Sequence, residues 1–489
     1  MTDPRPSVLV LLTAALVVGC VPTLPGGAAR AARTAVPTHF DAPGEDAAAS
    51  SATVDWRTFF RDPNLVALIT TALANNQELN LTVQETLIAS NEVMARRGEY
   101  LPSLSVGVGA GLDRVGRYTS QGQADEANGV AEHLQNYSVR LYASWEVDIW
   151  GRLRNNANAA NGRYLATVEG QRFVVTRLVA EIATKYYELL ALDRRLAFVR
   201  SNVELQRQAL EAVRVQQQAA RVTMLAVRRF EAQLQGFQSR QFEIQQRIVE
   251  VENEINFLCG RFPQPVTRSQ EDLLTLEPPT VQTGAPGQLL ENRPDVRQAE
   301  LALAAASLDV RAARARFYPA LRLDAGFGYQ SFDVTRLLNT PDSLLYNLFA
   351  GVMAPLLNRS GITAEYFSAN SREMQAVLRY ERAILAAYLD VNTGLHRLRN
   401  ITERYALQRE QVARLSEGVE ISTLLFNSAR ADYLEVLTTR RDFLEAQMDL
   451  IETKERQLAA AVTLYQALGG GWRPASPPDP QTATTGASR

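Results

Sequence analysis

Two cysteines and three histidines are the side chains of this sequence best suited to nucleophilic catalysis or to binding soft metal ions. The histidines His39, His133 and His396 lie far apart, and none belongs to a cluster with metal-ligand spacing. The sequence also lacks a phosphate-cradling glycine loop and a nucleophile elbow. Cys259 closes an apolar helical pattern before Gly260, as a buried structural thiol would. These residues argue against an enzyme, and they predict neither a metal site nor a cofactor site.

Cys20 is the residue whose surroundings predict a covalent modification. An apolar stretch, Val8–Val18, has the length of a signal-peptide core and is too short for a transmembrane helix. It runs through Gly19 into Cys20, an ending that resembles the bacterial lipobox, in which the cysteine is lipidated and becomes the new N-terminus. We therefore expect a lipoprotein signal peptide over 1–19 and a diacylglycerol and an N-acyl chain, such as palmitate, on Cys20. Because Val21 and not Asp follows, the outer membrane is the expected destination.

Composition bounds the rest of the chain. The 489 residues include 51 basic and 53 acidic side chains, a balance that argues against a nucleic-acid partner. Residues 20–55 are rich in Ala, Pro, Gly and Ser and are predicted to form a lipidated flexible tether. Residues 473–489 have a similar character and are predicted to form a disordered C-terminal tail.

The remaining sequence repeats one unit of about 210 residues, a period far too long for a solenoid repeat. An aromatic-proline step leads into an alternating segment at Pro102 and again, 217 positions later, at Pro319. We predict a first structural repeat over 56–265, a linker over 266–288 and a second repeat over 289–472.

Each repeat carries two segments that alternate apolar with small or polar residues. They lie at about 103–113 and 137–148 in the first repeat and at about 320–331 and 344–356 in the second. Such alternation suits a strand between lipid and water, and about 10 tilted residues cross the hydrocarbon layer. A single segment would equally suit a soluble hairpin, but four in duplicated pairs favour the membrane. Four strands have open edges, which lipid does not tolerate, so several copies must pool their strands.

Long helical patterns follow the strands, at about 152–258 and 361–468. Their apolar residues recur at intervals of three, four and seven, the spacing of coiled-coil seams. A helix over 152–220 would be on the order of 100 Å long, too long for a globular core. Each pattern reverses once, near 219–227 and near 426–437, so each repeat should end in a helical hairpin tip.

Taken together, the duplicated strands, the long helices and the lipobox resemble the TolC/OprM-type outer-membrane efflux channels, in particular the NodT-like lipoprotein branch that serves resistance-nodulation-division pumps. The segments that carry this resemblance are Trp56–Pro63, Ser144–Arg152, Arg293–Val296, Asp432–Leu437 and Leu464–Trp472. The resemblance implies a mainly α fold with a small transmembrane β part. In it, three copies of the duplicated strand-strand-long helix unit form a 12-stranded β-barrel continuous with a 12-helix periplasmic α-barrel.

The resemblance also implies a function in antibiotic resistance and related transport. The expected homotrimer conducts drugs or other small molecules passively from the periplasm to the exterior. Its expected partners are a periplasmic membrane-fusion adaptor, an inner-membrane resistance-nodulation-division transporter and outer-membrane lipid. A type I secretion duct or a metal-efflux duct would look similar. A lipid-anchored coiled-coil scaffold would explain the helices and Cys20 but not the four strands.

Acidic residues near the periplasmic tip form a pore constriction in such channels. The resemblance assigns this role to Glu435, with Asp432 one turn earlier on the same helical face. Ordinary solvated carboxylates or a helix N-terminal preference would explain both residues equally well. The sequence departs from the family pattern at Thr438, where a second acid is common. It departs again at Ala220 and Ala226, which replace a glycine and an acid.

Overall fold

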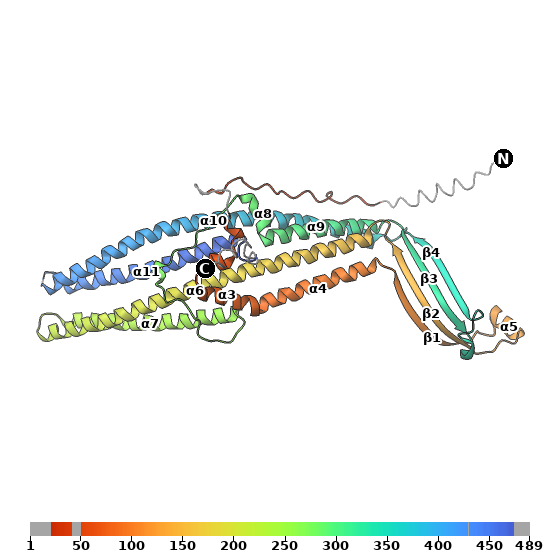
Figure 1. Ribbon diagram of the computed structural model, residues 1–489, viewed down its shortest axis with the longest axis horizontal. Coiled ribbons are helices and arrows are strands. Elements are labelled where there is room, and N and C mark those ends of the chain that lie inside the picture. The colour runs from red at the N-terminus through yellow and green to blue at the C-terminus, as the bar shows by residue number, and fades with distance from the viewer. Residues whose placement is uncertain (1–20, 42–49, 429, 474–489) are drawn as a thin grey trace, which may run out of the picture. The chain divides into compact units, whose positions relative to one another are not determined.

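The computed structural model describes residues 21–41, 50–428 and 430–473 (Figure 1). The predicted signal peptide, Cys20, residues 42–49 of the predicted tether and residues 474–489 of the predicted tail lie outside the described residues. The chain divides into two compact units. Unit 1 comprises Met1–Ala32, Leu87–Ala166 and Glu300–Arg379, and unit 2 comprises Arg33–Thr86, Thr167–Ala299 and Tyr380–Arg489.

Helices make up most of the described chain. They are η1 (Ser51–Thr53), α2 (Trp56–Phe59), α3 (Pro63–Asn75), α4 (Gln77–Glu99), α5 (Ser120–Ala127), α6 (Arg152–Gln218), α7 (Met224–Leu258), η2 (Leu273–Thr275), η3 (Pro286–Gln288), α8 (Leu289–Asn292), α9 (Pro294–Ala315), η4 (Val334–Arg336), α10 (Ser360–Asn427) and α11 (Tyr433–Ala467). The strands are β1 (Ser103–Asp113), β2 (Leu134–Val147), β3 (Ala320–Ser331) and β4 (Leu344–Met353). No helix in the described ranges is both long enough and apolar enough to cross a bilayer.

The four strands of unit 1 form one antiparallel sheet in the order β1-β2-β3-β4. Two strand ends differ by three residues from the sequence-based expectation. Strand β2 begins at Leu134 because this residue pairs with Asp113, the last residue of β1. Strand β4 ends at Met353 because its partner Ala320 is the first residue of β3, so no ladder continues towards 356.

The register of the sheet collects most of the apolar residues of the four strands on one face. Val108 lies opposite Val139, Val139 opposite Tyr329, and Phe327 opposite Tyr346. Much of this face is uncovered within the described chain, and Leu348 is 81% exposed. A pleated sheet alternates its side chains between faces, so the small and polar residues share the opposite face.

Unit 2 is built around a large apolar core that the segment Trp56–Phe60 enters. The rings of Phe59 and Tyr465 stack with centroids 4.0 Å apart, and the Tyr465 hydroxyl donates to the Val54 carbonyl at 2.7 Å. Tyr186, on α6, is fully buried, and its hydroxyl bonds the Asp62 carboxylate immediately before Pro63. The first sequence motif therefore anchors α2 and α3 on α6 and α11.

The duplication is visible in unit 2 as a pair of corresponding helix-end contacts. In the first repeat, the buried amide of Asn76 donates to the Leu258 carbonyl at the end of α7 at 2.9 Å. Gly260, with φ +64°, allows the Asn75 carbonyl so close that an added Cβ would lie 2.3 Å from its oxygen. Only glycine adopts this conformation readily and leaves this space.

The second repeat makes the same contact with a charged side chain. Arg293, which is 6% exposed, donates to the Ala467 carbonyl at the end of α11 at 3.0 Å. Gly469, with φ +90°, meets the Asn292 carbonyl as Gly260 meets that of Asn75. Arg293 therefore makes in the second repeat the helix-end contact that Asn76, with its uncharged amide, makes in the first.

Residues 21–41 of the predicted flexible tether make contacts with α10. In unit 1, Asn370 of α10 accepts from the Ala29 amide and donates to the Gly27 carbonyl, each at 3.2 Å. In unit 2, the Phe40 ring stacks on Tyr388 of α10 with centroids 5.5 Å apart. The small and polar composition that suggested flexibility also lets an extended backbone bond side chains of a helix.

Candidate pore-lining surface

The small and polar face of the sheet carries a hydrogen-bonded network. Ser144 of β2 donates to the Asp324 carboxylate of β3 at 2.7 Å and accepts from Arg322 at 3.2 Å. Farther along the same face, Arg140 donates to the Gln330 side-chain oxygen, and Gln330 donates to Asn136 at 2.8 Å. These bonds tie β2 to β3 through side chains and keep the face polar, as a water-lined wall requires.

Glycines let large side chains lie flat on this face. A Cβ added at Gly107 would lie 3.0 Å from the Tyr142 ring, and one added at Gly351 would lie 2.5 Å from the Phe349 ring. These rings therefore occupy space that a side chain on the neighbouring glycine would fill. A side chain added at either glycine would force the neighbouring ring to move.

The junction between the sheet and the helices explains the segment Ser144–Arg152. The Arg152 guanidinium pairs with Glu146 at 2.7 Å. Asp148 accepts from the amides of Leu153 and Arg154 at 3.0 and 2.9 Å, so it satisfies donors at the start of α6. The Trp150 indole donates to the Pro319 carbonyl at 2.7 Å, which joins the two repeats within unit 1.

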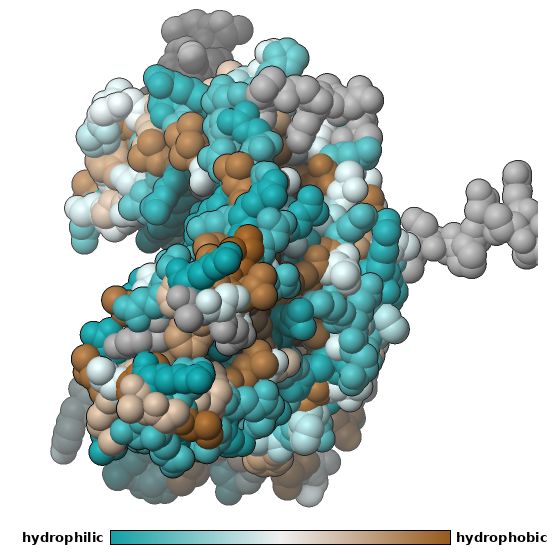
Figure 2. All heavy atoms as spheres, turned by 90° about the vertical axis from the view of Figure 1, so that its left-hand side faces the viewer, coloured by the Kyte–Doolittle hydropathy of each residue, from teal (hydrophilic) through white to brown (hydrophobic). Residues whose placement is uncertain are grey.

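Both predicted constriction residues lie at the beginning of α11. Asp432 occupies the N-cap position without a side-chain capping bond, and Glu435 lies in the first turn. Both are exposed, and neither carboxylate has an ion-pair partner within the described ranges. Figure 2 looks onto this hairpin-tip end, where hydrophilic and apolar surfaces are interspersed. The two exposed carboxylates make the local electrostatic potential more negative. The positive end of the α11 dipole lies at the same N-terminus and stabilises both charges.

The two substituted positions in the first hairpin tip have distinct environments. Ala220 adopts φ 58°, the left-handed region in which glycine is favoured. Ala226 is fully buried and packs in the small core that contains Phe230 and Leu437. A carboxylate at position 226 would therefore be buried in this arrangement, which gives a physical reason for the departure from the family pattern.

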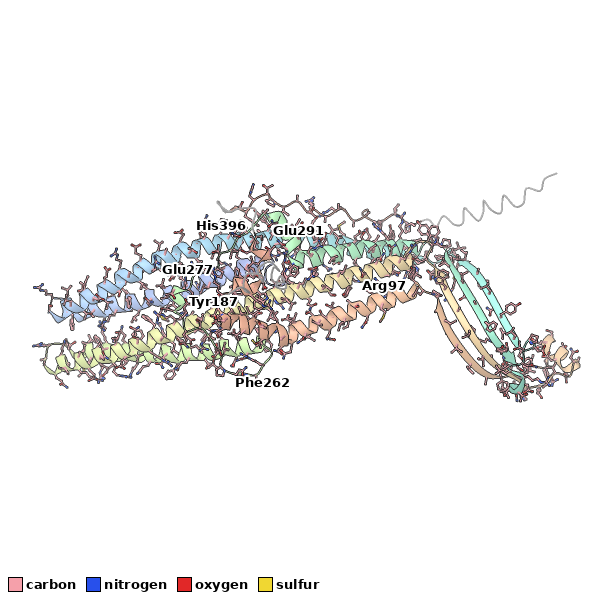
Figure 3. The ribbon with its side chains drawn as sticks, in the orientation of Figure 1. Arg97, Tyr187, Phe262, Glu277, Glu291 and His396 are labelled. Carbon is pink, nitrogen blue, oxygen red and sulfur yellow. The ribbon has the colours of Figure 1, made fainter. Side chains whose placement is uncertain are left out.

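The residues with potential for catalysis are dispersed. His39 lies in the segment along α10, His133 precedes β2, and His396 lies on α10 (Figure 3). Cys259 donates to the Leu68 carbonyl at 3.7 Å, and burial raises the pKa of its thiol. Across the described ranges, no group of three or more His, Cys, Asp or Glu residues is arranged to hold a metal ion.

The network of Arg140, Gln330, Ser144 and Asp324 was not predicted from the sequence. The signal was present, because all four residues fall on the non-apolar positions of alternating strands. What the alternation could not supply was the register, which decides that Ser144 faces Asp324 and that Arg140 faces Gly328.

Comparison with known proteins gives a consistent result. The Outer membrane efflux protein family matches residues 68–261 and 285–470, which is more than half of the chain. The chain is 28% identical over 421 residues to the cation efflux system protein CusC of Escherichia coli O6:H1, covering 86% of this chain and 88% of the relative. It is 28% identical over 478 residues to the pyoverdine export outer membrane protein OpmQ of Pseudomonas putida, covering 98% of this chain and 100% of the relative.

Solved structures share the fold. A membrane protein from Pseudomonas aeruginosa gives a TM-score of 0.81 at 24% identity, over 90% of this chain and 99% of that one. The open state of the Neisseria gonorrhoeae outer membrane channel MtrE gives a TM-score of 0.80 at 23% identity, over 92% and 98%. The duplicated sheet, the long hairpins and the sequence match lead to one assignment: the chain belongs to the Outer membrane efflux protein family and is the outer-membrane channel component of an efflux system.

Proposed function

We propose that this chain acts as a homotrimeric, lipid-anchored channel that completes a tripartite pump. The observation that carries the proposal is that the protomer has open edges. In unit 1, β1 and β4 each pair on one side only, which leaves two backbone edges that lipid does not tolerate. Pairing β4 of one copy with β1 of the next would satisfy both edges.

Unit 2 has no open sheet edges among its described residues, but it presents exposed apolar helix faces. Helix α6 pairs with α11 through Arg195 and Glu452 at 2.8 Å, and α7 and α10 pack beside α6 and α11 respectively. The outer helices then expose apolar side chains at helical spacing: Phe242, Val249 and Phe257 on α7, and Leu407, Ile421 and Leu424 on α10. A heterologous α7–α10 contact buries both stripes and closes into a ring if the rotation permits. That the ring contains three copies follows from the family.

The anchor is proposed to be lipid on Cys20. Supporting this, Val21 and Leu24 pack on the apolar cluster of Phe317 and Tyr366 in unit 1, which fixes the start of the described chain close to the sheet-bearing unit's helices. Two or more acyl chains are enough for stable anchoring.

The proposed partners are a periplasmic membrane-fusion adaptor and an inner-membrane resistance-nodulation-division transporter, which would supply energy and choose the cargo. The relatives' names cover pyoverdine export, toluene efflux and cation efflux, so this channel type serves chemically different solutes. We propose drugs or other small molecules as cargo. A metal-efflux duct is the second candidate, on the likeness to CusC, and nothing favours a type I secretion duct.

We further propose that Asp432 and Glu435 form an acidic ring at the periplasmic tip. The exposure of both carboxylates at the start of α11 supports this role. Three copies would place six carboxylates around the opening and attract cations there.

Purified full-length protein in planar bilayers tests these proposals. We expect trimers by light scattering in detergent, discrete channel openings, and a larger conductance with weaker cation preference when Asp432→Asn and Glu435→Gln are combined. Glu420→Gln, at an exposed carboxylate of α10 outside the proposed ring, is the matched control. Absence of conductance in a trimeric preparation would disprove the channel function. A double variant that behaves like the control would remove only the acidic ring.

A further inference from the structure

Arg140 occupies an isolated position in the middle of the polar face of the sheet. Its two cross-strand neighbours are glycines, Gly107 on β1 and Gly328 on β3. The other charged residues of the four strands lie towards the strand ends: Asp113, Glu146, Arg322 and Asp324. The middle of this face therefore carries one type of fixed charge, a guanidinium.

The guanidinium also lacks an acidic partner. Within the described ranges, its guanidinium donates to the neutral side-chain oxygen of Gln330, and its Nε is buried without a hydrogen-bond partner. The other arginine of the four strands, Arg322, is matched by Asp324 at 3.6 Å, and Arg152 at the start of α6 pairs with Glu146 at 2.7 Å. Arg140 therefore retains its charge without a compensating anion, while its neighbours on the same face are neutralised.

We propose that Arg140 is a specificity-determining residue that favours passage of solutes bearing carboxylate or phosphate groups through the membrane-spanning part of the channel. The inference rests on the proposed trimer, in which the polar face lines the lumen and three copies of Arg140 form one ring. A guanidinium presents a planar fork of donors that matches oxyanions.

The ring would counterbalance the acidic tip. The proposed carboxylates repel a passing anion, and the arginine ring in the sheet attracts it. A cation is attracted by the carboxylates and repelled by the arginine ring. We place the three charges about 10 Å from the pore axis in water and screen them over one Debye length. Their potential at the axis then changes the ratio of potassium to chloride permeability by about fivefold. Removing the ring should raise that ratio by this factor.

Reversal potentials in a potassium chloride gradient measure the ratio directly. We expect Arg140→Gln to shift the channel about fivefold towards potassium, Arg140→Glu to shift it further, and Arg140→Lys to leave it near the wild-type value. Arg336→Gln is the matched control, since it removes an exposed arginine that Asp333 already neutralises in η4. A shift in Arg140→Gln no larger than in this control overturns the proposal.

The same recordings separate this inference from the proposed function. Channels that open in the wild type and in Arg140→Gln with unchanged selectivity leave the trimeric channel intact and remove the role of Arg140. A wild type that forms no channels removes both. The alternative is a purely structural role, in which the bond from Arg140 to Gln330 ties β2 to β3. That role predicts loss of trimers in Arg140→Lys as well, with normal selectivity in any channels that form. Such a result also overturns the proposal.

Discussion

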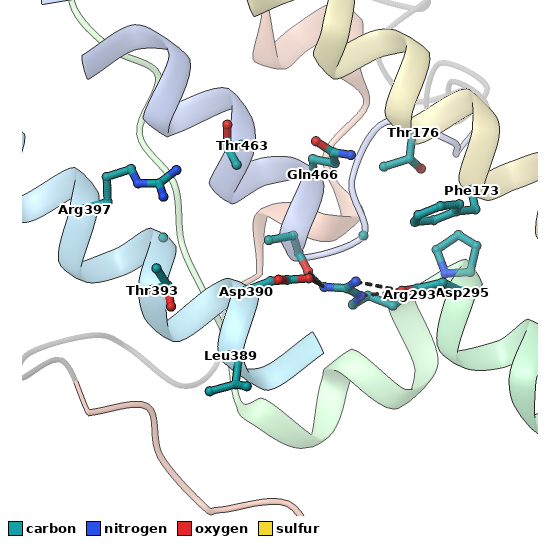
Figure 4. A pocket seen from close by; sticks show the side chains of 14 residues that line it. Phe173, Thr176, Arg293, Asp295, Leu389, Asp390, Thr393, Arg397, Thr463 and Gln466 are labelled. Atoms are coloured by element: carbon teal, nitrogen blue, oxygen red, sulfur yellow. Dashed lines mark hydrogen bonds and ion pairs between the residues drawn. The ribbon is translucent and has the colours of Figure 1, made fainter. Parts of the chain in front are cut away.

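Replacing Arg293 with methionine tests the contact that closes the second repeat. Methionine keeps most of the volume and removes the guanidinium. The native side chain pairs with Asp295 at 2.7 Å and with Asp390 at 3.1 Å and donates to the Ala467 carbonyl at 3.0 Å (Figure 4). Figure 4 shows Arg293 and the two carboxylates beside a pocket of about 350 Å³.

The magnitude follows from what each partner loses. The Asp390 side chain is 55% exposed, so water replaces its lost ion pair at little cost in free energy. The Asp295 side chain is only 24% exposed and the end of α11 is buried, so both lose a partner that water replaces poorly. Breaking a fully buried ion pair costs about 3–5 kcal/mol, and partial exposure here reduces the expected loss to about 2–4 kcal/mol. The corresponding uncharged contact, probed by Asn76→Ala, should cost less, about 1–2 kcal/mol.

The assay is the apparent Tm in detergent at one fixed scan rate, because unfolding of a large membrane protein is under kinetic control. Arg314→Met, at an exposed arginine of α9, provides the same chemical change without the buried contact. We expect Arg293→Met to lower the apparent Tm by several degrees, Asn76→Ala to lower it less, and Arg314→Met to leave it nearly unchanged. Equal values for Arg293→Met and Arg314→Met would refute the reasoning.

Two further predictions concern backbone conformation and protonation. Ala220→Gly relieves a left-handed alanine and should stabilise the first hairpin tip by about 0.5–1 kcal/mol, measured by slower proteolysis of the tip; faster cleavage would contradict it. Burial raises the pKa of Glu455 on α11, so the folded state binds this proton more tightly and loses stability as pH rises from the unfolded pKa through the folded pKa. Glu455→Gln should therefore raise the apparent Tm at pH 8 but not at pH 4, and an equal gain at both values would exclude the protonation mechanism.

Much of the fold could be read from the chain because its signals are local and repeated. Alternation over 103–113 and 320–331 predicted strands with the bounds that β1 and β3 have, and apolar residues at coiled-coil spacing predicted the long helices. The contacts of residues 21–41 with Asn370 and Tyr388 of α10 could not be predicted from composition, since they depend on a distant helix. The positions of Asp432 and Glu435 were found only through the family resemblance, and their role stays a prediction.

The sequence by itself determined the alternation, the helix lengths and the duplication, because each depends on residue spacing along one segment. Tertiary structure alone decided the pairings across segments: Arg293 with the end of α11, Ser144 with Asp324, and Arg140 between two glycines. Strand register and the docking of helix ends join residues more than one hundred positions apart. No local periodicity encodes such pairings, because they are set by the packing that satisfies all the segments at once.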